Sequence, residues 1–175
     1  QATYFVFDNA DREIFRVAPE GNVIASFYDD NGNLVSSCQF AQTIAPPADY
    51  TALVKLLQSL QPNPATDRIT AHTYDNANRR TSTTDPCGNV TRSQPDALGQ
   101  VQTETKADGS VWTYQYDRDK RKTSTTAPDK VVTAHTYDPN GNPLRLTQAN
   151  GLPDQRAFQS TYNACGKLIA TRLVG

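Results

Sequence analysis

The chain is built from short runs of apolar or β-branched residues separated by clusters of Gly, Asn and Asp. The runs are about five to seven residues long, as in residues 22–28, 34–40 and 111–116. Short runs that are bounded by turn-forming residues are typical of β-strands joined by tight antiparallel turns. The pattern therefore predicts an all-β array of hairpins.

A second pattern sets the length of each hairpin. An aromatic residue followed by Asp recurs in Tyr74-Asp75, Tyr116-Asp117 and Tyr137-Asp138, and Pro95-Asp96 fills the slot between the first two, so that each step is 21 residues. The same spacing separates Phe7-Asp8 from Tyr28-Asp29, and Tyr162-Asn163 follows Tyr137 after 25 residues. A fixed period of this size is the signature of a repeat architecture. We expect tandem 21-residue hairpin repeats that form a curved antiparallel sheet.

Two columns of turn residues keep the same phase. Four residues after each aromatic position stand Asp11, Gly32, Asn78, Gly99, Lys120, Gly141 and Gly166. Ten residues later stand Gly21, Gly88, Gly109, Lys130 and Gly151. Most of these residue types accept a left-handed backbone at low cost, so each period is interpreted as strand, turn, strand, turn.

One segment breaks the period. The 46 residues between Tyr28 and Tyr74 are one period plus an insertion of 25. The predicted organisation is residues 1–40 as repeats, 41–69 as an insertion with a helix at about 48–60, and 70–175 as repeats. In that helix one face carries Tyr50, Leu53, Leu57 and Leu60. Val54 and Leu56 widen this apolar stripe. We expect this face to cover the helix's own sheet; a docking helix for a partner is the alternative.

Composition favours a sheet with one thinly apolar face over a single deep core. Only 37% of the residues are hydrophobic, the mean hydropathy is −0.64, and the net charge is −1. This charge gives no reason to expect binding to nucleic acid or to anionic lipid. The sequence contains no signal peptide or membrane-spanning run, so we expect no membrane insertion. Since it lacks methionine, we interpret it as a segment of a longer polypeptide.

No group of residues suggests a catalytic or metal site. The three cysteines, Cys38, Cys87 and Cys165, are an odd number and form no CxxC pair. His72 and His135 occupy equivalent slots three repeats apart, too far to share a metal ion. We therefore expect no enzyme activity, no metal and no cofactor.

The Asp-x-Asn-x-Asn runs that start at Asp29 and Asp138 resemble the beginning of a calcium loop, but they lack the Gly and Glu at the required positions. They are better interpreted as turn residues. A carboxylate at a turn entrance can accept backbone N–H groups two residues on. The repeated Asp is thus predicted to hold each turn, and the aromatic residue beside it to pack on the next hairpin.

Trp112, Tyr114 and Tyr116 alternate along one predicted strand and so share one face. Such a row of rings can pack within the sheet or bind a sugar or a single-stranded nucleic acid. We favour packing and keep Trp112 and Tyr114 as candidate glycan contacts.

These repeats also carry a family resemblance. The sequences Tyr-Asp-Asp-Asn-Gly-Asn at 28–33, Tyr-Asp-Pro-Asn-Gly-Asn at 137–142 and residues 108–117 resemble YD repeats. Such repeats occur in bacterial Rhs proteins, in the B and C components of Tc insecticidal toxin complexes and in teneurins. The resemblance implies that hairpins spiral into a hollow shell around a polypeptide cargo, in a secreted or cell-surface protein. The self-cleaving terminal motif of the family is not found, so no autoproteolysis is carried over.

Together these observations predict a structural YD-repeat segment of a bacterial Rhs or Tc-type shell. Its partners are expected to be polypeptide cargo or neighbouring YD repeats. The apolar terminal strands, residues 1–7 and 168–174, lack protecting charges, so head-to-tail self-association through strand addition is also expected. A cell-surface adhesion or glycan-binding module is the alternative. The residues predicted to define the repeat are Phe7, Asp8, Tyr28, Asp29, Tyr74, Asp75, Asp96, Tyr116, Asp117, Tyr137, Asp138, Tyr162, Gly32, Gly99, Gly141 and Gly166.

Overall fold

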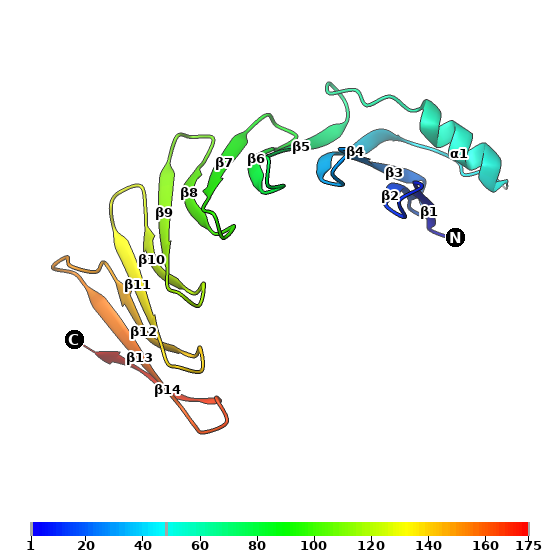
Figure 1. Ribbon diagram of the computed structural model, residues 1–175. Helices are drawn as coiled ribbons and strands as arrows, with labels where there is room; N and C mark the ends of the chain where they lie inside the picture. The colour runs from blue at the N-terminus through cyan, green and yellow to red at the C-terminus, as the bar shows by residue number, and fades with distance from the viewer. Residues whose placement is uncertain (1, 48, 175) are drawn as a thin grey trace. The chain divides into compact units, whose positions relative to one another are not determined.

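The computed structural model describes residues 2–47 and 49–174 (Figure 1). This part of the chain forms one open sheet of 14 strands, hydrogen-bonded in sequence order, and one helix. The N-terminal elements are β1 Tyr4–Phe7, β2 Glu13–Val17, β3 Asn22–Tyr28, β4 Leu34–Thr43, α1 Tyr50–Ser59, β5 Arg68–Tyr74 and β6 Arg80–Thr84. They are followed by β7 Val90–Pro95, β8 Val101–Thr105, β9 Val111–Tyr116, β10 Lys122–Thr126, β11 Val132–Tyr137, β12 Pro143–Gln148, β13 Arg156–Tyr162 and β14 Leu168–Val174. The prediction of an all-β hairpin array with one inserted helix is confirmed.

The chain divides into two compact units, Gln1–Thr91 and Arg92–Gly175. Within the first unit the insertion packs on the N-terminal repeats, and β5 and β6 belong to this unit. No helix in the described residues is long and apolar enough to cross a membrane.

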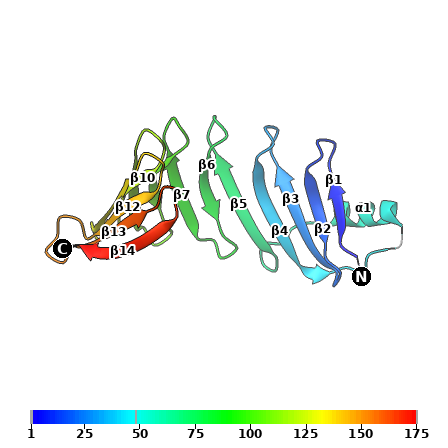
Figure 2. The ribbon, with the colours of Figure 1, turned by 90° about the horizontal axis from the view of Figure 1, so that it is seen from below.

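The N-terminal unit has its core between the sheet and α1 (Figures 1 and 2). Leu53 and Leu57 are fully buried against a sheet face whose buried residues are Val6, Val17, Val23, Ala25, Cys38 and Phe40. Asp49 begins the helix, since its carboxylate accepts a hydrogen bond from the backbone N–H of Ala52 (2.8 Å). Within the described residues, α1 thus covers its own sheet.

The C-terminal unit has strands but no helix among its described residues, and most of its side chains are half-buried or exposed. On β9 the side chains alternate: Trp112, Tyr114 and Tyr116 are half-buried, whereas Val111 on the other face is 42% exposed. Among the described residues of this unit, Thr147 and Ala157 are buried. A thinly covered sheet is what the polar composition predicts.

The two ends of each hairpin differ in how the strands pair. Between β2 and β3 the ladder runs through Phe15↔Ala25, Arg16↔Ile24 and Val17↔Val23, next to the turn at Gly21, and then stops. The ladders between β8 and β9 and between β10 and β11 also cover three pairs each, again next to the connecting turn. Toward the aromatic-Asp end, therefore, consecutive hairpins separate. Any contact between them at that end must come from groups outside the backbone hydrogen-bond ladder.

Candidate functional site

The repeated site of this chain is the turn that follows each aromatic position, which we call the YD turn. In all seven YD turns the residue in the Asp position donates its backbone N–H to the carbonyl four residues on, at 2.8–3.0 Å. The residue three positions after this Asp then has a positive φ, from 57° at Asp11 to 88° at Gly141. Where Gly fills this slot no Cβ opposes the left-handed backbone, which is the reason for the glycine column.

The Asp side chain closes the turn. One carboxylate oxygen of Asp8 accepts hydrogen bonds from the backbone N–H groups of Ala10 (2.8 Å) and Arg12 (3.0 Å). The same pair of bonds recurs at Asp29, Asp75, Asp96 and Asp117. Asn163 makes both bonds with its amide oxygen in the last turn, so a neutral side chain is also compatible with this geometry.

These bonds favour the ionised carboxylate. The side-chain hydrogen bond from Arg12, followed by its backbone N–H, holds the pKa of Asp8 below its ordinary value. The Asn33 amide does the same for the pKa of Asp29, and the Asn142 amide for the pKa of Asp138. Each YD turn of this kind is therefore most stable with a charged Asp.

A second residue, four positions after the Asp, extends the turn to its neighbour. Arg12 pairs with Asp8 through its Nε (2.7 Å) and also donates to the carbonyl of Asp29, in the next YD turn (3.3 Å). Its guanidinium lies over the ring of Tyr28 at 4.8 Å. Arg121 repeats this with Asp117, the carbonyl of Asp138 (3.1 Å) and the ring of Tyr137 (5.0 Å).

The tyrosine hydroxyl joins consecutive hairpins where the ladder stops. Each one donates to the backbone carbonyl of the residue that opens the strand after the preceding YD turn, and we call this bond the hydroxyl lock. The five locks are Tyr28 to Glu13 (3.2 Å), Tyr74 to Leu34 (2.9 Å), Tyr116 to Val101 (2.9 Å), Tyr137 to Lys122 (2.8 Å) and Tyr162 to Pro143 (2.9 Å). The carbonyls lie beside the β-bulges at the YD turns, such as those at Tyr28 and Tyr137.

Sequence reasoning placed the tyrosines in the repeat but missed the lock. The signal was present, because three of the five locks link a tyrosine to the residue 15 positions before it. The insertion lengthens this separation to 40 for Tyr74, and the longer last turn lengthens it to 19 for Tyr162. Phe7 and Pro95, in the two remaining aromatic slots, have no hydroxyl to donate.

The row of rings on β9 lies between charged groups. Tyr114 donates its hydroxyl to Glu104 (2.9 Å), and the Lys122 ammonium lies 4.1 Å from the centre of its ring. Burial, together with this bond to Glu104, raises the pKa of Tyr114 to about 12. The Lys106 ammonium lies 5.9 Å from the Trp112 ring. Both rings named as glycan contacts are therefore held in place by neighbouring side chains.

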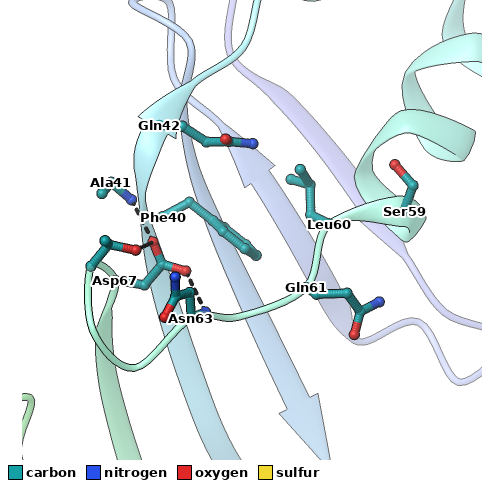
Figure 3. A pocket seen from close by; sticks show the side chains of 9 residues that line it. Phe40, Ala41, Gln42, Ser59, Leu60, Gln61, Asn63 and Asp67 are labelled. Atoms are coloured by element: carbon teal, nitrogen blue, oxygen red, sulfur yellow. Dashed lines mark hydrogen bonds between the residues drawn. The ribbon is translucent and has the colours of Figure 1, made fainter.

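Each unit contains a pocket of at least about 560 Å³. The first, of about 580 Å³, lies beside the end of β4 and the segment that follows α1 (Figure 3). Phe40 and Leu60 are its apolar lining residues, and the Asp67 carboxylate accepts from the backbone N–H groups of Ala41 (2.9 Å) and Asn63 (2.8 Å). Asp67 thus holds the loop, and burial, followed by the Asp67 charge, raises the pKa of the nearby Cys38 thiol to about 11. Such a thiol is not a reactive nucleophile.

The second pocket, of about 560 Å³, lies in the C-terminal unit between the YD turn at Asp96 and the diverging ends of β8 and β9. Tyr114 and Tyr116 line it together with amide and hydroxyl side chains. One of these, Gln100, occupies the slot that Arg12 and Arg121 fill in other turns.

The histidines and cysteines do not assemble into a centre. No group of three or more His, Cys, Asp or Glu in the described residues could hold a metal ion. His72 accepts or donates a hydrogen bond at Thr83 (3.0 Å), and its pKa is lowered by burial and by Arg80. Cys38, Cys87 and Cys165 are all free thiols.

Comparison with known proteins agrees with this geometry. The RHS Repeat family model matches residues 96–132, a stretch that contains two YD turns and the lock of Tyr116. Residues 96–132 are similar to an RHS repeat. The match covers β8, β9 and β10, and the hairpins on either side lie outside it. No curated protein sequence matches the chain.

Solved structures extend the likeness to nearly the whole fold. A crystal structure of TcdB2-TccC3 without its hypervariable C-terminal region aligns over 98% of the chain, with a TM-score of 0.73 at 14% identity. A second crystal structure of TcdB2-TccC3 gives 0.72 at 16% identity, and a Photorhabdus luminescens Tc holotoxin pore gives 0.73 at 15%, each over 98% of the chain. The chain spans 9% of each of these much longer proteins. At this identity the likeness establishes the fold.

Proposed function

We propose that this chain is a structural YD-repeat segment of a bacterial shell that encloses or carries a toxin polypeptide, in a secreted or cell-surface protein. The observation that carries the proposal is the lock between consecutive hairpins, found in a fold that aligns over 98% of the chain with TcdB2-TccC3. The locks and the sequential strand order support a structural role, because both join each hairpin to the next.

A graft tests the proposal. The matched segment of TcdB2-TccC3 is replaced by this chain, and particle assembly is followed by electron microscopy. We expect particles of the parental shape, in which added protease cuts the hypervariable C-terminal region of TccC3 no faster than in the parent measured alongside. A graft that carries Phe at positions 74 and 137 is the control, because it keeps the strands and loses two locks. If the unaltered graft assembles no better than this control, or leaves the C-terminal region open to protease, the structural proposal is wrong.

We also propose head-to-tail association of the isolated chain. The two terminal strands expose apolar side chains: Phe5 and Phe7 on β1 are 42% and 53% exposed, and Leu173 on β14 is 64% exposed. Strand addition between β14 of one copy and β1 of the next would pair both edges and form an open, head-to-tail assembly. Val6→Pro removes a backbone donor and Phe5→Lys adds an edge charge, so each variant should sediment as a monomer at concentrations where the wild type does not.

A cell-surface adhesion or glycan-binding role is the second candidate. It is favoured by the half-buried ring row of β9, with Trp112 and Tyr114 as glycan contacts. Glycan-array binding that disappears in Trp112→Ala or Tyr114→Ala would support it. No binding by the wild-type chain would exclude it.

A further inference from the structure

We propose that the second pocket, which lies in the C-terminal unit, is a binding site for one ring of a neutral saccharide. Gln100 orients the sugar in this site. The inference rests on the second candidate function, because it names the subsite and the ligand class, and it is independent of the shell role. The two differ in the residue on which binding depends: Gln100 in this site, and the Trp112 ring in the second candidate function.

The first argument is an unpartnered donor. The Gln100 Nε2 is buried and has no hydrogen-bond partner among the described residues. The amides of Asn33 and Asn142, in the same slot of other YD turns, donate to their Asp carboxylates at 2.9 and 2.8 Å. Gln is one methylene longer, and Gln100 is one of the residues that line the pocket. A buried amide without a partner costs free energy, and turning the side chain toward a ligand oxygen in the pocket would remove that cost.

The second argument is the chemistry of the pocket wall. Besides the two tyrosines, it is lined mainly by amide and hydroxyl groups, from Gln100, Gln102, Gln115, Thr103, Thr113 and Thr123. Groups of these two kinds both donate and accept hydrogen bonds, as sugar hydroxyls do. An apolar ligand would leave them without partners. No cationic side chain lines the pocket and Asp96 does, so an anionic ligand is disfavoured.

The third argument is preorganisation. The Tyr116 hydroxyl is fixed on the carbonyl of Val101, and the Tyr114 hydroxyl on Glu104. Two rings with fixed positions can present an apolar surface to the C–H groups of a sugar without losing side-chain freedom on binding. The volume of about 560 Å³ lies in the usual range for small-molecule sites.

The test uses the 175-residue chain with glucose, galactose, mannose and N-acetylglucosamine as separate probes, followed by saturation-transfer NMR and calorimetry. We expect millimolar binding of at least one probe, with transfer to the pocket tyrosines. Gln100→Leu should weaken this binding about tenfold, because one donor is lost. Gln61→Leu, the same change in the first pocket, should leave it unaltered.

Gln100→Asn separates binding from folding. Asn is the residue of the equivalent slot at positions 33 and 142, so this variant should unfold at the same temperature as the wild type or higher, and still lose sugar binding. If no probe binds the wild type, this site is wrong, and the glycan array alone then decides the glycan candidate. If a probe binds, and Trp112→Ala abolishes binding while both Gln100 variants bind normally, the glycan candidate stands and this site is overturned.

Discussion

At the scale of single residues, the aromatic and the Asp of each repeat have separate tasks. The Asp closes its own turn through bonds within five residues, as in Asp29 with Asn31 and Asn33. The tyrosine acts between hairpins, as in the bond from Tyr74 to the carbonyl of Leu34. The repeat therefore combines a local device with a long-range one, and the two can be tested apart.

Tyr74→Phe should lower the free energy of unfolding of the N-terminal unit by about 1 kcal/mol, because it removes one hydrogen bond and leaves a partly buried carbonyl without its donor. Tyr50→Phe is the matched control in the same unit, since the Tyr50 hydroxyl makes a longer, exposed bond to the carbonyl of Phe5 (3.3 Å). Urea unfolding followed by circular dichroism measures both. Equal values for the two variants would contradict the importance of the lock.

The carboxylates of the YD turns predict loss of stability in acid. Hydrogen bonds lower the pKa of Asp29 below 3.8, its ordinary value, so the folded state binds protons less readily than the unfolded state. The stabilisation is complete above pH 3.8 and is lost as the pH falls through the folded-state pKa values. Asp8, Asp75, Asp85, Asp108, Asp117 and Asp138 are shifted in the same direction and add to the effect.

Asp29→Asn should therefore lower the melting temperature at pH 7 and make it less dependent on pH below 4. The turn should still form, because Asn163 closes an equivalent turn. Asp30→Asn, at the next and exposed position, is the control and should leave the acid profile unchanged. Melting temperatures between pH 7 and pH 2 measure this; an unchanged profile for Asp29→Asn would count against the charged turn.

At the scale of elements, the strands and turns follow from local sequence rules, whereas the contacts between consecutive hairpins do not. The Gly and Asp columns gave the turns because a left-handed backbone and an Asx bond are properties of a few adjacent residues. The hydroxyl lock depends on which strand of the preceding hairpin lies beside each tyrosine, and this follows only once the register is known. The unpartnered amide of Gln100 could not be predicted either, because Gln differs from Asn in this slot only by one methylene and no periodic pattern marks the difference.

For the helix, too, the sequence predicts the element but not which of its apolar side chains are buried. Its apolar stripe was visible in the sequence, and the structure shows Leu53 and Leu57 fully buried on the sheet while the adjacent Leu56 is 37% exposed. Leu57→Ala should cost about 2–5 kcal/mol of unfolding free energy, because it removes a fully buried side chain and leaves a cavity. Leu56→Ala should cost less than about 1 kcal/mol. Denaturant unfolding compares the two; similar losses would mean that α1 is not held by this face.

At the scale of the whole molecule, the hydroxyl lock predicts which hydrogen bond a strand added at the β14 edge could make. The carbonyls that receive a lock open the strand after a YD turn, and the last such residue is Leu168 at the start of β14. No described tyrosine donates to it, and the donor would come from a strand added at this edge. In a head-to-tail assembly the residue in that place is Phe7 of the next copy, which has no hydroxyl.

Phe7→Tyr should therefore strengthen the association of the isolated chain. A new bond from the Tyr hydroxyl to the Leu168 carbonyl of the neighbouring copy, worth about 1 kcal/mol, would raise the association constant roughly fivefold. Phe5→Tyr adds the same hydroxyl two residues away, on another exposed ring outside the lock position, and should have little effect. Sedimentation velocity over a range of concentrations compares the three proteins. A Phe7→Tyr chain that associates no more than Phe5→Tyr would show that copies do not join in the register of consecutive repeats, because in that register only position 7 faces the carbonyl.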